Sequence, residues 1–67
     1  SRAERREIQH FLIKRGYDIG EADGLIGDKT RKAIIREQNR LGLNPTGRAG
    51  QQILRAFRDE NAKLMMN

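Results

Sequence analysis

The seven glycines of this 67-residue chain all lie between Gly16 and Gly50, and their placement restricts what the chain can fold into. Apart from proline, glycine is the residue least compatible with a helix interior. The segments before Gly16 and after Gly50 contain no glycine. Both ends of the chain are therefore predicted to be helical, and the glycines to mark the connections between helices.

A glycine pattern occurs twice, in ADGLIGDKTRKAI from residue 22 and in PTGRAGQQILRAF from residue 45, at an offset of 23 residues. Gly24 and Gly27 of the first copy align with Gly47 and Gly50 of the second. Glycines three apart allow a backbone to turn closely against a neighbouring helix, where a Cβ would collide. We therefore expect one turn, made twice, with a helix after each copy. Asp28 has a side chain favoured at a helix N-cap, whereas the helix after Gly50 lacks a strong cap.

Apolar residues repeat with helical spacing in three segments, which predicts helices over about residues 3–15, 28–41 and 51–62. Gly16 is expected to end the first helix in a Schellman-type cap, with Tyr17 folding back on Leu12. Gly42 and Leu43 repeat this stop after the second helix. The predicted fold is all-α: a compact three-helix bundle with a long, glycine-rich loop between its first two helices. The side chains expected to face inward are Ala3, Ile8, Phe11, Leu12 and Arg15 in the first helix, Thr30, Ala33, Ile34, Glu37 and Leu41 in the second, and Ile53, Leu54, Ala56 and Phe57 in the third.

Length and composition fit one small, marginally stable domain over residues 1–67. Hydrophobic residues make up 36% and charged residues 34%, which predicts a thin core under a heavily solvated surface. There is no cysteine, so packing alone must hold the chain together. No apolar run is long enough to span a membrane. Because the chain begins at Ser1 rather than at a methionine, we expect a piece of a longer protein.

The net charge of +5 favours anionic partners, and it is unevenly distributed. Residues 17–28 contain four acids and no Lys or Arg, whereas the flanking predicted helices are basic. This separation argues against a helix-turn-helix, whose connection has three or four residues, because here the connection has about a dozen and is acidic. Binding of nucleic acid through charge stays open as the less favoured reading.

Motifs for catalysis or cofactor binding are not convincing in this chain. GLIGDKT has the wrong spacing for a phosphate-binding loop and an acid where phosphate would sit. A calcium loop aligned on Gly24 would place Ile19 and Thr30 at the two terminal ligand positions. His10 with Glu7 could hold a metal only weakly. Glu21 and Asp23 have little cleft in which to act as an acid pair. We therefore expect no catalytic residue, no metal and no cofactor.

The segment from Arg6 to Gly47 resembles the peptidoglycan-binding domain found as a module on bacterial cell-wall enzymes. The likeness covers about two-thirds of the chain, and two positions depart from it. Glu37 stands where the family usually has an aromatic residue, and Gln51–Ile53 stand where a threonine usually opens the third helix. The matching residues are Ile8, Gln9, Leu12, Gly16, Tyr17, Asp23, Gly24, Gly27, Thr30, Ala33, Ile34, Gln38, Gly42, Leu43 and Gly47.

This resemblance implies a three-helix module that binds peptidoglycan (murein) without cutting it. The amino-acid sequence of the 16–34 segment is most similar to that of the C-terminal module of lytic murein transglycosylases. A transglycosylase parent would place the module in the periplasm or cell envelope, tethering a catalytic domain to its substrate as a monomer. By the same resemblance, seven residues are expected to build the fold, namely Gly16, Gly24, Gly27, Thr30, Gln38, Gly42 and Gly47.

The murein contacts are expected on the 17–27 loop and on the first turn of the second helix. Tyr17 either stacks on a sugar or only caps the first helix. Asp23 either accepts sugar hydroxyls or only forms a turn. Arg31 either pairs with a peptide carboxylate or is a solvated charge. A different class of function, protein docking, remains open through the apolar tail Leu64–Met66 and the basic helix faces.

Overall fold

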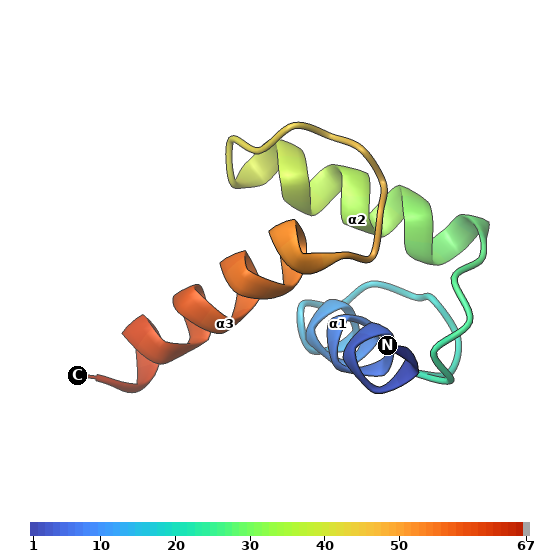
Figure 1. The fold of residues 1–67 in the computed structure, drawn as a ribbon, viewed down its shortest axis with the longest axis horizontal. Helices are drawn as coiled ribbons and strands as arrows, with labels where there is room; N and C mark the ends of the chain where they lie inside the picture. Colours follow the sequence, from blue (N-terminus) through green and yellow to red (C-terminus); the bar gives the residue numbers. More distant parts are fainter. Residues whose placement is uncertain (67) are drawn as a thin grey trace.

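A computed structural model describes residues 1–66, which form three helices and no strand. They are α1 (Arg2–Lys14), α2 (Asp28–Arg40) and α3 (Gln51–Met65). In Figure 1, α2 crosses the top, α1 lies below it and is seen nearly end-on, and α3 runs away from both toward the C-terminus. The predicted all-α, three-helix fold is confirmed. The described part measures 34 × 23 × 22 Å, because the second half of α3 projects beyond the bundle.

One apolar core joins the inner faces of the three helices. The rings of Phe11 and Phe57 pack with centroids 5.2 Å apart, which fixes α1 against α3. Each fully buried Ile, Leu or Phe stabilises the fold by on the order of 1.5–3 kcal/mol. The buried apolar residues are Ile8, Leu12, Ala33, Ile34, Ile53, Leu54 and Phe57.

The first two helices end as the glycine positions predict. The amide of Tyr17 donates to the carbonyl of Leu12 at 3.1 Å, and the amide of Leu43 donates to that of Gln38 at 2.8 Å. These bonds satisfy carbonyls that a helix end would otherwise leave unpaired. They also direct Tyr17 back over the core, against which its ring packs.

Gly24 and Gly47 both make the close approach that the repeat predicts. Gly24 has a φ of +83°, and a Cβ added there would lie 2.5 Å from the Cγ of Arg2 and 3.1 Å from its carbonyl oxygen. Gly47 has a φ of +74°, and a Cβ would lie 3.2 Å from the Cγ of Arg31. The prediction is wrong for the second glycine of each pair, because a Cβ on Gly27 or Gly50 would meet nothing within 4 Å. Those two residues are extended N-caps that start α2 and α3.

Each close turn is held by a buried glutamine from the preceding helix. Gln9 accepts a hydrogen bond from the Gly24 amide at 2.7 Å and donates to the Leu25 carbonyl at 2.9 Å. Gln38 accepts from the Gly47 amide at 2.9 Å and donates to the Thr46 hydroxyl at 3.0 Å. The amide side chain thus satisfies a loop that reverses inside the protein, where an unpaired amide is costly. The repeat is therefore a helix, a glutamine clamp and a glycine turn, made twice.

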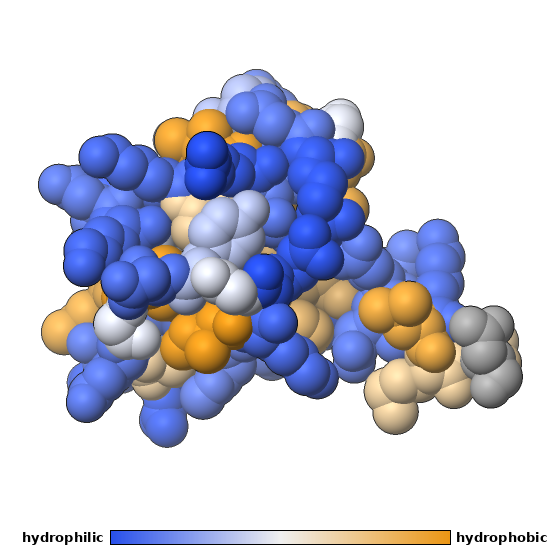
Figure 2. Space-filling view, turned by 180° about the vertical axis from the view of Figure 1, so that it is seen from behind, coloured by the Kyte–Doolittle hydropathy of each residue, from blue (hydrophilic) through white to orange (hydrophobic). Residues whose placement is uncertain are grey.

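The helix ends differ from prediction in two places. Asp28 is not the N-cap of α2; Gly27 takes that position, and Asp28 is the first helical residue with a side chain that is 91% exposed. An acid in the first turn still interacts favourably with the helix dipole. Helix α3 continues to Met65 rather than ending near residue 62. The last apolar residues, Leu64, Met65 and Met66, are exposed, and apolar surface gathers at this projecting end in Figure 2.

Candidate functional site

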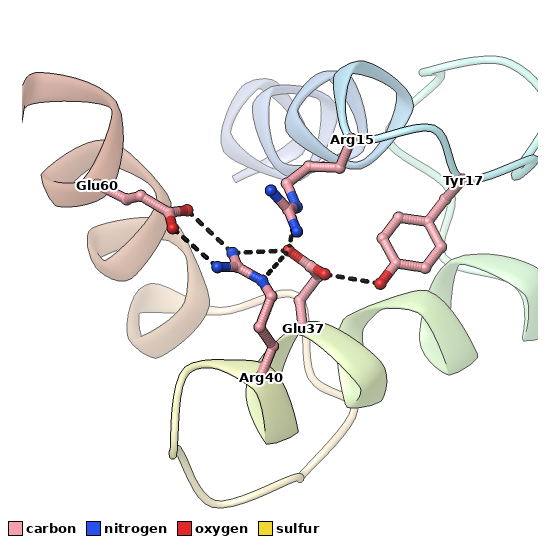
Figure 3. Close-up of polar contacts among 5 residues, drawn as sticks. All are labelled: Arg15, Tyr17, Glu37, Arg40 and Glu60. Carbon is pink, nitrogen blue, oxygen red and sulfur yellow. Dashed lines mark hydrogen bonds and ion pairs between the residues drawn. The ribbon is translucent and has the colours of Figure 1, made fainter. Parts of the chain in front are cut away.

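The most connected group of polar side chains surrounds Glu37, where the ends of α1 and α2 meet α3 (Figure 3). The Glu37 carboxylate is 1% exposed and forms an ion pair with the Nε of Arg15 at 2.7 Å. Its Oε2 accepts a hydrogen bond from the Tyr17 hydroxyl at 2.6 Å, and its Oε1 accepts from Arg40 at 2.9 and 3.1 Å. Arg40 also donates to both carboxylate oxygens of Glu60 on α3, at 2.8 and 2.9 Å. The cluster therefore ties all three helices together.

The electrostatics of this cluster favour the ionised form of Glu37. Burial alone would raise the pKa of Glu37, but hydrogen bonds from Arg40 and Tyr17 and the nearby guanidinium charges outweigh it, so the pKa is lowered. The pKa of Tyr17 is raised, first by its hydrogen bond to Glu37 and then by burial. A carboxylate that is ionised and fully bonded has no proton to give and no free oxygen for a substrate. Glu37 is therefore a structural anchor, which holds Tyr17 in place.

An open groove of about 550 Å³ lies next to Tyr17, between the start of the α1–α2 connection and the outer side of α2. We call it the α2 groove. This volume is within the range of small-ligand sites. Its lining is Tyr17, Asp18, Ile19, Lys29, Lys32, Ala33, Ile35 and Arg36.

Three exposed cations, Lys29, Lys32 and Arg36, line the α2 groove from a single side of the helix. Their spacing of three and four residues places them one turn apart along α2. Within residues 1–66, none of the three forms an ion pair. Asp18 is the single acid in the lining. The α2 groove therefore presents a positive wall that is available to an anionic ligand.

A second hollow of about 340 Å³, which we call the loop hollow, adjoins the first and shares Ile19 and Lys29 with it. It is acidic, because Glu21, Asp23 and Asp28 line it. The Oδ1 of Asp23 accepts a hydrogen bond from the Leu25 amide at 2.9 Å, and this bond is the main reason why the pKa of Asp23 is lowered. Asp23 therefore forms a turn, which is one of the two roles expected for this residue.

The structure does not bring the three predicted contact residues into a single hollow. Tyr17 lines the α2 groove and Asp23 lines the loop hollow, whereas Arg31 lines neither. Arg31 donates to the Ile26 carbonyl at 3.4 Å and packs its stem beside Gly47. Sequence reasoning missed the groove cations as a set: the signal was the spacing of Lys29, Lys32 and Arg36, but without the groove it did not separate them from the other bases of α2.

A third hollow of about 390 Å³ lies between the end of α1 and the second half of α3. Three apolar residues and four polar or charged ones line it: Phe11, Phe57 and Leu64, and Lys14, Arg15, Glu60 and Asn61. Within residues 1–66, no cluster of three or more His, Cys, Asp or Glu side chains is arranged to hold a metal ion. No helix in that range is long and apolar enough to cross a membrane.

Three short helices around one core, with an open groove lined by three cations, are compatible with a small binding module. Comparison with known families specifies the class: the model described as "Putative peptidoglycan binding domain" matches residues 1–57. The chain therefore belongs to this peptidoglycan-binding family, which confirms the resemblance found in the sequence. Membership indicates association with the cell wall through a binding domain.

A curated relative, "Putative OxPP cycle protein OpcA" of Synechococcus elongatus, is 40% identical over 55 residues. The alignment covers 82% of this chain and 12% of that protein, so the chain spans a small fraction of the relative's length. The likeness is thus a likeness between domains. It leaves the activity of a longer parent protein to be proposed on other grounds.

Proposed function

We propose that the chain is a non-catalytic murein-binding module that holds a cell-wall-degrading enzyme, a lytic transglycosylase, on its substrate in the periplasm or cell envelope. The observation that carries the proposal is the α2 groove, an open and preformed cationic surface on a chain of a peptidoglycan-binding family. A tether of this kind needs little affinity of its own, because linkage raises the local concentration of substrate around the catalytic domain.

In this proposal the murein contacts come from the α2 groove and the loop hollow. Tyr17 offers its ring to a sugar or peptide, and the hydrogen bond to Glu37 fixes that ring in advance. Fixing a contact residue before binding lowers the entropy lost on association. Asp23 at the loop hollow accepts hydroxyl groups, and Arg31 adds a contact beyond the groove. The module acts as a monomer, and the reaction belongs to a catalytic domain elsewhere in the parent.

Co-sedimentation with purified sacculi in moderate salt tests the proposal. The wild-type domain is expected in the pellet, and Tyr17→Ala is expected to lose much of this retention. Tyr17→Phe keeps the ring and loses the hydrogen bond to Glu37, so it is the control for the ring and is expected to keep most of the retention. Arg31→Ala measures the contribution from outside the groove. If the folded wild-type domain stays in the supernatant at every salt concentration, murein binding is refuted.

A protein-docking function is the second candidate, and one observation favours it. Leu64, Met65 and Met66 are 71%, 77% and 84% exposed at the projecting end of α3, and Leu64 also lines the third hollow. Surface of this kind is typical of protein contacts. The same sedimentation experiment separates the two functions, because Leu64→Ser leaves murein retention unchanged if the wall is the partner. A basic nucleic-acid domain would instead bind any polyanion, with affinity falling steeply as salt rises.

A further inference from the structure

The cations of the α2 groove form no ion pair within residues 1–66, and Arg2, Arg5, Arg6, Lys14, Arg48 and Arg55 form none either. Lys29, Lys32 and Arg36 are set apart because all three line one groove. Arg15 and Arg40 are held by Glu37, and Arg58 forms a two-pronged pair with Glu7 at 2.7 Å, joining α1 to α3. Those pairs stabilise the bundle. Lys29, Lys32 and Arg36 contribute no such pair within residues 1–66, although each lies beside the same groove.

The internal repeat shows that the fold itself does not need these three charges. At the offset of 23 residues, Lys29, Lys32 and Arg36 of α2 align with Gln52, Arg55 and Asp59 of α3. The second unit builds the same glutamine clamp and glycine turn with a neutral, a basic and an acidic residue at these positions. The uniform positive charge of the first unit is therefore free to serve a ligand.

The remaining walls and the length of the groove suit a short peptide. Ile19, Ala33 and Ile35 give it apolar surface between the charges. From Lys32 to Arg36 the helix rises by about 6 Å, at about 1.5 Å per residue. An extended peptide covers this distance in about two residues. Two carboxylates separated by about that length can therefore each meet a cation.

We propose that the α2 groove recognises the peptide stem of murein through its carboxylates rather than the neutral glycan. This inference rests on the proposed function. Lys32 and Arg36 pair with the carboxylates, since charge-assisted hydrogen bonds are the strong ones and a guanidinium matches a carboxylate in shape. Lys29 borders the loop hollow, whose acidic residues repel the carboxylates of the stem. The carboxylates are therefore favoured at the end of the groove formed by Lys32 and Arg36. A neutral sugar would leave all three cations without a partner.

The acids beside the groove argue against a nucleic-acid backbone as its occupant. Asp18 lies in the groove, and Glu21, Asp23 and Asp28 line the adjoining loop hollow. A continuous polyanion leaving the groove on that side would meet these like charges. A short stem bound at Lys32 and Arg36 does not need to extend into the loop hollow.

The test is an NMR titration of the ¹⁵N-labelled domain with the tetrapeptide stem released from murein. The parallel titrant is the same stem with its carboxylates converted to carboxamides. Lys32→Glu is compared with Arg55→Glu, because both change the charge by the same amount at exposed positions that the repeat makes equivalent. We expect the shifts to follow the groove residues. We expect Lys32→Glu and amidation each to weaken binding by about tenfold or more, and Arg55→Glu to change it less than about twofold.

The outcomes separate this inference from the proposed function. Retention on sacculi without any binding of the tetrapeptide, or equal loss in both Glu variants, overturns the stem-carboxylate assignment and leaves wall binding intact. Tetrapeptide binding in the groove without retention on sacculi supports the assignment of an anionic peptide and refutes wall anchoring. Equal binding of the free and amidated stems also overturns the inference. Tighter binding of a DNA oligonucleotide, weakened by Lys32→Glu, would identify a polyanion site instead.

Discussion

Replacing Gly24 by alanine isolates the close turn on which the whole arrangement depends. Gly24 and Gly20 have nearly the same left-handed backbone, with φ of +83° and +82°, but different surroundings. A Cβ at Gly24 would lie 2.5 Å from the Arg2 side chain and 3.1 Å from the Arg2 carbonyl, whereas at Gly20 it would meet nothing within 4 Å. Gly20→Ala is therefore a control that carries the backbone strain without the collision.

The two substitutions are expected to lower the free energy of unfolding by different amounts. An alanine in the left-handed region costs about 1–2 kcal/mol, reduced by about 0.4–1 kcal/mol because the unfolded chain loses freedom. Gly20→Ala should thus lower the free energy of unfolding by about 1 kcal/mol. At Gly24 the collision adds about 1–3 kcal/mol, so the total is about 2–4 kcal/mol. For a domain of this size that is a fall in Tm of about 10–30 °C.

Urea unfolding followed by circular dichroism measures both free energies of unfolding. The larger side chain of Gly24→Val is expected to prevent folding altogether. Equal effects of Gly24→Ala and Gly20→Ala would refute the close approach of Gly24 to α1. A Gly24→Ala domain that melts like the wild type would also remove the left-handed turn from the account.

Three further results are expected. Gln9→Ala leaves the buried Gly24 amide unpaired and removes the hydrogen bond to the Leu25 carbonyl. The free energy of unfolding measured in urea titrations should therefore fall by about 2–4 kcal/mol. An unchanged value would contradict the glutamine clamp. The pKa of Glu37 is lowered, so the stability that its charge contributes is present above its ordinary pKa of 4.5 and is lost as the pH falls through the folded pKa. Glu37→Gln should therefore flatten the fall of Tm below pH 5. An unaltered profile of Tm against pH would mean that Glu37 is not ion-paired. Tyr17→Phe should cost about 1–2 kcal/mol of stability through the lost hydrogen bond while retention on sacculi persists, and loss of retention at full stability would assign the hydroxyl to the ligand.

The helices and their ends could be predicted because their causes are local. Apolar spacing and glycine position place α1, α2 and the start of α3 to within a residue or two. The errors also have local causes. Asp28 and Gly27 both suit an N-cap, and the extended backbone of Gly27 places it there. The end of α3 carries no glycine or proline, so the sequence contains no stop signal before Met65.

The glutamine clamps and the Glu37 cluster could not be predicted, because they join residues that are far apart in the chain. Periodicity placed Glu37 on the inner side of α2, but its partners come from the end of α1 and from the same helix, and the link to α3 runs through Arg40. Gln9 matched the family pattern without revealing that it meets Gly24, fifteen residues away. A buried polar residue shows in a sequence as an interruption of the apolar pattern, and only the fold supplies its partner.

The candidate contact surface was predicted in part. The 17–27 loop and the start of α2 do form hollows, and Tyr17 lies at the wall of the larger one. The sequence does not separate Arg31 from Lys32 and Arg36, because it shows which bases share a helix and not which of them border a groove. The assignment of Tyr17, Asp23 and Arg31 as murein contacts stays a prediction.

Hydrogen–deuterium exchange of the wild-type domain, with and without purified sacculi, tests the central claim that the α2 groove is the wall-binding surface. The account predicts slower exchange over residues 17–19 and 29–36 when murein is present. Exchange over the second half of α3, near Leu64 and Met65, should not change. Protection confined to that end of α3, or no protection at all in a domain that sediments with sacculi, would place the murein contact elsewhere and contradict the claim.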